Sequence, residues 1–130
     1  MPLDVTRRVA ATRAWVAQLA ATGSRCGGLV AEWIDAYMRN ITTQRARLAT
    51  ASGTVPVPVE VCPLHDPCVM LWAAAPHLFT VERLPIRVIA DRSERDGATV
   101  IDASGQAIDV LTGADVEAAL AFAAQRLAAV

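Results

Sequence analysis

Apolar side chains recur every three or four residues between residues 29 and 51, and this repeat constrains the fold more than any other feature. Such spacing places the side chains along one face of an α-helix. Leu29 and Trp33 widen the face, and Ser52-Gly53 follow as a helix end. The sequence therefore predicts a long amphipathic helix with one buried side. The repeating residues are Val30, Ile34, Tyr37, Met38, Ile41 and Leu48.

A shorter helix is predicted over residues 4–21, with Asp4 as its N-cap and Gly23 at its end. Residues 22–28 then form a short, glycine-rich link, which makes the two helices fold back on each other. Residues 1–54 are therefore predicted to form an antiparallel helical hairpin. The apolar stripe of the first helix consists of Val5, Val9, Thr12, Val16 and Leu19.

An extended segment is predicted at residues 55–61, where valine alternates with proline or glutamate. Its two prolines exclude a central strand, so the segment is either an edge strand or a polyproline-like stretch. Residues 62–68 are expected to form a proline-bounded turn. Residues 69–75 fit a short helix and a buried strand equally well.

An antiparallel meander is predicted from about residue 78 to residue 111, because short polar residues followed by glycine supply turns between apolar runs. The final helix is expected to begin near Thr112, with residues 112–115 as a capping box. This helix carries few charges, which favours burial on more than one side. The predicted strands are Leu78–Glu82, Pro85–Asp91, Thr99–Ala103 and Gln106–Leu111.

Together these elements predict a single α+β domain over residues 1–130. A helical hairpin (1–54) would precede an extended segment, a small antiparallel sheet of three or four strands, and a C-terminal helix packed on that sheet (55–130). The length is typical of one domain. The hydrophobic fraction of 54% and the charged fraction of 19% exclude a disordered tail.

The charge balance argues against binding to nucleic acid. The net charge is −1, although residues 1–54 hold seven arginines against three acids and residues 55–130 hold five arginines against ten acids. We interpret this asymmetry as attraction between the two halves, because no aromatic residues interleave with the arginines as a base-stacking surface requires. The absence of lysine is typical of a GC-rich bacterial or phage genome.

The cysteines and the N-terminal residues predict a cytoplasmic protein that does not span a membrane. Three cysteines are an odd number, which disfavours a disulfide framework. The start of the chain lacks a basic region followed by an apolar core. The longest apolar run, residues 69–76, is far shorter than the ~20 residues that cross a bilayer.

The most prominent chemical motif is a Cys-x2-His-x2-Cys cluster formed by Cys62, His65 and Cys68. In a tight turn this spacing lets two sulfurs and one imidazole nitrogen bind a single zinc or iron ion, and zinc requires a fourth ligand. His77 is the candidate for that ligand, with Cys26 or water as alternatives. The other interpretation is that the two cysteines are small buried side chains and His65 is an ordinary turn residue.

Cys26 is a weak candidate for a catalytic nucleophile. It is expected in a glycine-rich loop just before a helix, where the helix dipole and Arg25 would favour a thiolate. The alternative is a small residue accommodated in a tight turn. The chain contains no phosphate-binding loop and no metalloprotease or hydrolase-elbow motif.

These observations favour a non-enzymatic protein-interaction or regulatory module that forms a homodimer, because the final helix and the tryptophans offer more apolar surface than one small sheet covers. No cofactor is expected in that case. Two alternatives stay open at this stage. One is a metal-binding protein that uses the Cys-His-Cys cluster, and the other is a small enzyme with an enclosed pocket between helices and sheet.

Overall fold

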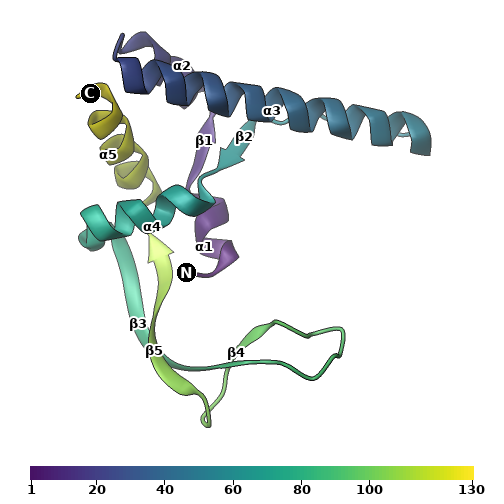
Figure 1. Cartoon of the computed structure of the whole chain (residues 1–130), viewed down its shortest axis with the longest axis vertical. Helices are drawn as coiled ribbons and strands as arrows, with labels where there is room; N and C mark the ends of the chain where they lie inside the picture. The colour runs from purple at the N-terminus through teal and green to yellow at the C-terminus, as the bar shows by residue number, and fades with distance from the viewer.

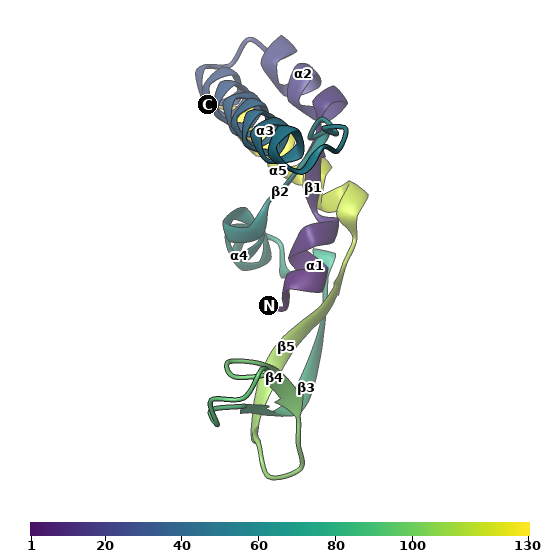
Figure 2. The same ribbon diagram turned by 90° about the vertical axis from the view of Figure 1, so that its right-hand side faces the viewer.

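The computed structural model describes residues 1–130 and confirms the α+β class. Helices α2, α3 and α5 form a block at one end, and a narrow β-sheet extends from the other end (Figures 1 and 2). The elements in chain order are α1 (Leu3–Arg8), β1 (Ala10–Thr12), α2 (Arg13–Ala21), α3 (Arg25–Ser52), β2 (Val61–Pro63), α4 (His65–Ala74), the 3-10 turn η1 (Pro76–Leu78), β3 (Phe79–Val88), β4 (Thr99–Ile101), β5 (Gln106–Ala114) and α5 (Val116–Ala128).

The single helix predicted over residues 4–21 is wrong, because a strand interrupts it. Val9 leaves the helical conformation, and β1 pairs antiparallel with β2, with Ala11 opposite Cys62. Thr12 then caps α2 by accepting a hydrogen bond from the backbone N–H of Trp15. Val9 and Ala11 are fully buried by this arrangement, so tertiary burial overrides the local helical pattern.

The long helix and the helical hairpin are confirmed. Helix α3 begins earlier than expected, at Arg25, because the Ser24 hydroxyl accepts a hydrogen bond from the N–H of Gly27 and starts the helix there. A Cβ on Gly27 would lie 2.6 Å from the Ser24 hydroxyl and 3.2 Å from a methyl group of Leu19. Glycine at this position therefore lets α2 and α3 approach closely.

The sequence allowed either a helix or a strand at residues 69–75, and residues 69–74 form part of helix α4. Helix α4 begins at His65, so the predicted turn at residues 62–68 is in fact strand β2 followed by the first turn of α4. Of the extended segment at 55–61, only Val61 belongs to a strand. Val59 is nevertheless buried and anchors the segment against α3.

The small antiparallel sheet is confirmed with three strands, but it is not the predicted meander. The strand order is β4-β3-β5, so β5 pairs with β3 and not with its neighbour in sequence, β4. The first two predicted strands are one continuous strand, β3, which runs through Pro85 because β4 pairs only beyond that residue. The last helix starts later than expected. Asp115 caps it by accepting from the N–H of Ala118, whereas Thr112 still lies in β5 and donates to Glu82.

The last helix packs mainly against the helical hairpin. Helix α5 contacts α2, α3, β1 and η1. The indole N–H of Trp15 in α2 donates a 3.1 Å hydrogen bond to the carbonyl of Leu120, which fixes α5 to the helical hairpin. The core therefore lies mainly among helices, and β1 and the inner ends of β3 and β5 contribute to it. Its buried members are Val9, Ala11, Ile34, Met38, Val59, Leu64, Cys68, Leu71, Phe79, Leu111 and Ala119.

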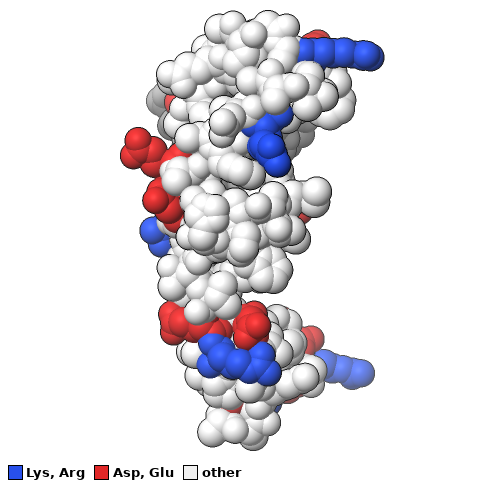
Figure 3. Space-filling view, turned by 90° about the vertical axis from the view of Figure 1, so that its left-hand side faces the viewer, with Lys and Arg blue, Asp and Glu red and all other residues white.

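The chain exposes much more surface than a compact protein of its mass. Its accessible area is 8675 Å², whereas about 6,600 Å² is expected for a compact monomer of this mass. The excess of about 2,000 Å² is comparable to what one partner contributes to a large permanent interface. Much of the face in Figure 3 carries no charged side chain. No helix is long and apolar enough to cross a membrane.

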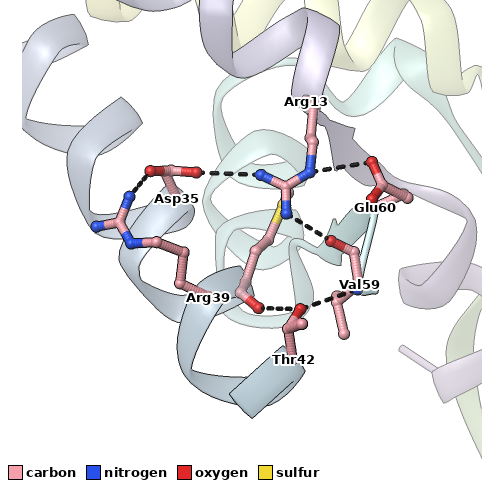
Figure 4. Close-up of polar contacts among 7 residues, drawn as sticks. Arg13, Asp35, Arg39, Thr42, Val59 and Glu60 are labelled. Atoms are coloured by element: carbon pink, nitrogen blue, oxygen red, sulfur yellow. Dashed lines mark hydrogen bonds and ion pairs between the residues drawn. The ribbon is translucent and has the colours of Figure 1, made fainter. Parts of the chain in front are cut away.

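One arginine joins three segments of the helical block (Figure 4). The Arg13 guanidinium donates to Glu60 at 3.0 Å, to Asp35 at 3.2 Å and to the carbonyl of Val59 at 3.0 Å. The Thr42 hydroxyl accepts from the N–H of Val59 and donates to the carbonyl of Met38. These contacts hold the irregular segment before β2 against α2 and α3.

Candidate functional site

An open pocket of about 650 Å³ lies between α2, α3, the β2–α4 junction and α5. Most of its lining is hydrophobic, and the polar side chains gather where β2 passes into α4. A largely apolar pocket with a few polar groups is the usual form of a small-molecule site. The residues most relevant to chemistry are Trp15, Trp33, Tyr37, Cys62, His65 and Asp66.

Aromatic side chains from two helices form one wall of this pocket. Trp33 and Tyr37 come from successive turns of α3 and are 64% and 49% exposed. Trp15 comes from α2 and is held by its hydrogen bond to Leu120. Exposed aromatic faces of this kind can stack on a planar heterocycle.

The polar side of the pocket is formed by His65 and Asp66, the first two residues of α4. The Nδ1 atom of His65 lies 2.7 Å from the hydroxyl oxygen of Thr6 in α1. Asp66 is the only acidic residue that lines the pocket. The site thus combines an exposed imidazole, one carboxylate and an aromatic wall.

The structure does not form the zinc site expected from the Cys-x2-His-x2-Cys spacing. Nowhere in the chain do three His, Cys, Asp or Glu side chains gather to hold a metal ion. Cys68 is fully buried in the core because α4 turns it inward, while Cys62 lies in the pocket wall and His77 in η1. Burial raises the pKa of the Cys62 and Cys68 thiols, which disfavours the thiolates that zinc requires.

Replacing Cys68 with serine is expected to destabilise the fold by about 1–3 kcal/mol, because it buries a hydroxyl in the apolar core. Cys68→Ala, which adds no polar group, is the matched control and is expected to cost less. Urea unfolding with and without a chelator measures both effects. A chelator that lowers the stability of the wild-type protein but not of Cys68→Ala would instead indicate a bound metal.

Cys26 does not contribute to this pocket. It lies in the first turn of α3 instead of in a loop, it is half-buried, and its backbone N–H donates to the carbonyl of Val130. It is absent from the pocket lining. Its candidacy as a nucleophile therefore gains no support from a neighbouring imidazole.

Sequence reasoning missed the aromatic wall and the role of Asp66 as a pocket carboxylate. Trp33 and Tyr37 were assigned to the buried stripe of α3, although they lie toward one edge of it and remain exposed. The available signal was the adjacency of His65 and Asp66 ahead of an apolar helix.

Comparison with known proteins decides the family. A sequence profile described as inosine-uridine preferring nucleoside hydrolase matches residues 1–121, which is nearly the whole chain. The chain belongs to this nucleoside hydrolase family. The expectation of a non-enzymatic interaction or regulatory module is therefore wrong.

Relatives within the nucleoside hydrolase family are substantially longer than this chain. The pyrimidine-specific ribonucleoside hydrolase RihA of Enterobacter sp. (strain 638) is 31% identical over 100 residues, which are 77% of this chain and 29% of that protein. The corresponding RihA of Salmonella typhimurium is 28% identical over 100 residues. The chain thus spans less than a third of these relatives.

Solved structures show the same fold. A plant nucleoside hydrolase, PpNRh1, matches with a TM-score of 0.77 and 20% identity over 100% of this chain and 41% of its own. The purine-preferring ribonucleoside hydrolase from Gardnerella vaginalis matches with a TM-score of 0.73 and 23% identity over 98% of this chain and 38% of its own. The fold of this chain therefore corresponds to part of the fold of these longer proteins.

Proposed function

We propose that these residues supply one wall of a nucleoside-binding site and a proton donor for hydrolysis of the bond between ribose and base. One observation carries the proposal. In a chain of the nucleoside hydrolase family, His65, Asp66 and the aromatic wall of α3 line a single pocket.

The reaction assigns a role to each side of the pocket. The oxygen of water bonds to C1′ of the ribose, the bond from C1′ to the base nitrogen breaks, and the departing base takes up a proton. An imidazole can supply that proton near neutral pH. His65 is the only histidine that lines the pocket, and Trp33 and Tyr37 present the faces on which the base would stack.

Polypeptide outside these 130 residues would complete the site. The chain spans 29% of its RihA relative from Enterobacter, and it exposes an excess of about 2,000 Å² of surface. Both observations support a pocket that is open here and closed by further polypeptide. The enclosed pocket between helices and sheet that the sequence suggested is replaced by this open one between helices.

The Asp66 carboxylate is the group that this chain would offer to a hard divalent cation such as calcium. Carboxylate oxygens suit such ions, but calcium takes six to eight oxygen ligands. The 130 residues gather no three such side chains, so they do not form a cation site by themselves. Asp66 would be one ligand among several. Calcium titration of the intact protein by calorimetry, compared with Asp66→Asn, tests this assignment.

The proposed activity is tested by incubating the intact protein that carries this chain with inosine and with uridine. Chromatography then measures the free base and the ribose that are released. Equal amounts of both products support the proposal, whereas unchanged nucleoside contradicts it. Both substrates are needed because the relatives are described as pyrimidine-specific and purine-preferring.

Trp33→Ala is expected to raise KM roughly 5- to 150-fold, because stacking on one base contributes about 1–3 kcal/mol. Trp33→Phe keeps an aromatic face and should retain most of the affinity. Trp72→Ala removes another exposed tryptophan that does not line the pocket, so it is the matched control. Steady-state kinetics at several nucleoside concentrations separate KM from kcat. Equal effects of Trp33→Ala and Trp72→Ala would contradict stacking at Trp33.

The homodimer and the cytoplasmic location stay proposals. Three free cysteines accord with a reducing compartment. Of the tryptophans that favoured a dimer interface, Trp33 is exposed, whereas Trp15 is held within the fold by its hydrogen bond to Leu120. Light scattering on the intact protein would measure its mass in solution.

A further inference from the structure

Thr6 is the one polar residue among the buried residues of this chain, at 5% exposure. It lies in α1, and His65 lies 59 residues further along the sequence at the start of α4. A polar side chain that is buried so deeply needs hydrogen-bond partners. Thr6 has two, and one of them is the imidazole of the pocket.

Only one direction of the Thr6–His65 hydrogen bond satisfies both contacts of the Thr6 hydroxyl at once. The Thr6 hydroxyl has a single proton, and the carbonyl of Leu3 lies 3.3 Å away as an acceptor for it. The oxygen of the same hydroxyl lies 2.7 Å from Nδ1 of His65. A carbonyl oxygen cannot donate, so the contact with Leu3 uses the hydroxyl proton of Thr6. The hydroxyl oxygen then accepts a hydrogen bond from Nδ1–H of His65.

We propose that Thr6 is a positioning residue that holds His65 in the Nδ1–H tautomer and leaves Nε2 as the ring nitrogen available to a ligand in the pocket. The inference rests on the proposed function for its catalytic meaning, whereas the tautomer itself does not depend on activity. A 180° turn of the ring would break the bond to Thr6, so the same contact also fixes the ring orientation.

The consequence for the reaction is that His65 can donate only through Nε2 when it carries a second proton. Without Thr6, the ring turns freely and the neutral form reverts toward the Nε2–H tautomer that dominates for histidine in water. A group held in the productive orientation reacts faster than one that must first find it. Groups that orient a metal-bound histidine through its second nitrogen typically change metal affinity or activity 10- to 100-fold. We expect an effect of the same size for the orientation of His65 by Thr6.

The test is a spectroscopic measurement on the intact protein with ¹⁵N-labelled histidine. Long-range ¹H–¹⁵N correlation spectra distinguish a protonated from an unprotonated ring nitrogen, and the spectrum of His65→Gln identifies the His65 signals by their loss. At a pH where the ring is neutral, wild-type His65 is expected to show a protonated Nδ1 and an unprotonated Nε2. A protonated Nε2 in the wild-type protein overturns the proposal without any variant having to fold.

Variants at Thr6 provide the second part of the test. Thr6→Val keeps the shape of the side chain without the oxygen and is expected to lose the Nδ1–H signature and to lower kcat roughly 10- to 100-fold. Thr6→Ser keeps the oxygen and should retain both. A Thr6→Val protein that keeps the Nδ1–H signature overturns the proposal. If the tautomer changes as expected but the wild-type protein releases no base, the positioning role is upheld and the proposed hydrolysis is not.

Discussion

Replacing His65 with glutamine is expected to lower kcat for nucleoside hydrolysis by roughly 100- to 10,000-fold, the range that a positioned proton donor contributes. Glutamine has a similar length and can hydrogen-bond, but it cannot deliver a proton to a departing base. KM should change much less, because the aromatic wall that holds the base is left in place. Initial rates of base release from inosine and uridine measure both parameters.

The chain provides a matched control for this substitution. His77 is its only other histidine, lies in η1 and does not line the pocket. His77→Gln is therefore expected to leave kcat unchanged. Equal losses in the two variants would point to a general effect on folding. A His65→Gln protein with wild-type kcat would remove the proton-donor role and leave His65 as a residue that only lines the pocket.

Truncating Met38 to alanine is expected to reduce the free energy of unfolding by about 2–5 kcal/mol. Met38 is fully buried at the centre of α3 and belongs to the core that joins this helix to β1, α4 and α5. The substitution removes buried apolar atoms and leaves a cavity among neighbours that belong to several elements. Such a core cannot collapse by moving one segment alone. Urea unfolding followed by far-ultraviolet circular dichroism measures the loss.

Two controls separate burial from the helical propensity of α3. Met38→Leu nearly conserves the volume and is expected to cost less than about 1.5 kcal/mol. Leu48→Ala lies on the same helix, where the side chain is 71% exposed, and should cost little. A loss for Leu48→Ala as large as that for Met38→Ala would show that the whole surface of α3 is covered in solution.

Local patterns were sufficient to predict the long helix, the helical hairpin and the presence of a sheet, because each depends on neighbours in the sequence. The apolar repeat of α3 predicts that helix, and apolar runs between turn residues predict the strands of the sheet. The pairing of β3 with β5 skips β4 and does not follow from these local patterns. The break between α1 and α2 could not be predicted in this way. It depends on the pairing of Ala11 with Cys62, which are 51 residues apart, and this pairing leaves no local signature.

The candidate pocket includes two of the residues that the sequence singles out for metal binding, Cys62 and His65. The spacing of Cys62, His65 and Cys68 drew attention to the β2–α4 junction, but helix geometry turns Cys68 into the core and leaves His65 in the pocket. The aromatic wall comes from α2 and α3, and these side chains lie near His65 only after the hairpin, the β1–β2 pair and α5 are assembled. A pocket that four separate segments form together cannot be predicted from the local sequence of any one segment.

The β-sheet that extends from the helical block is held mainly by its own hydrogen bonds and ion pairs, and α1 contacts β5. No residue between 80 and 110 is buried, and the buried members of β3 and β5, Phe79 and Leu111, lie at the end attached to the helices. A narrow sheet without a hydrophobic core gains little stability from the burial of apolar surface. Residues 80–110 therefore form a unit that can open locally while the helical block stays folded, and their amide protons should exchange with solvent through this partial opening long before the chain unfolds as a whole.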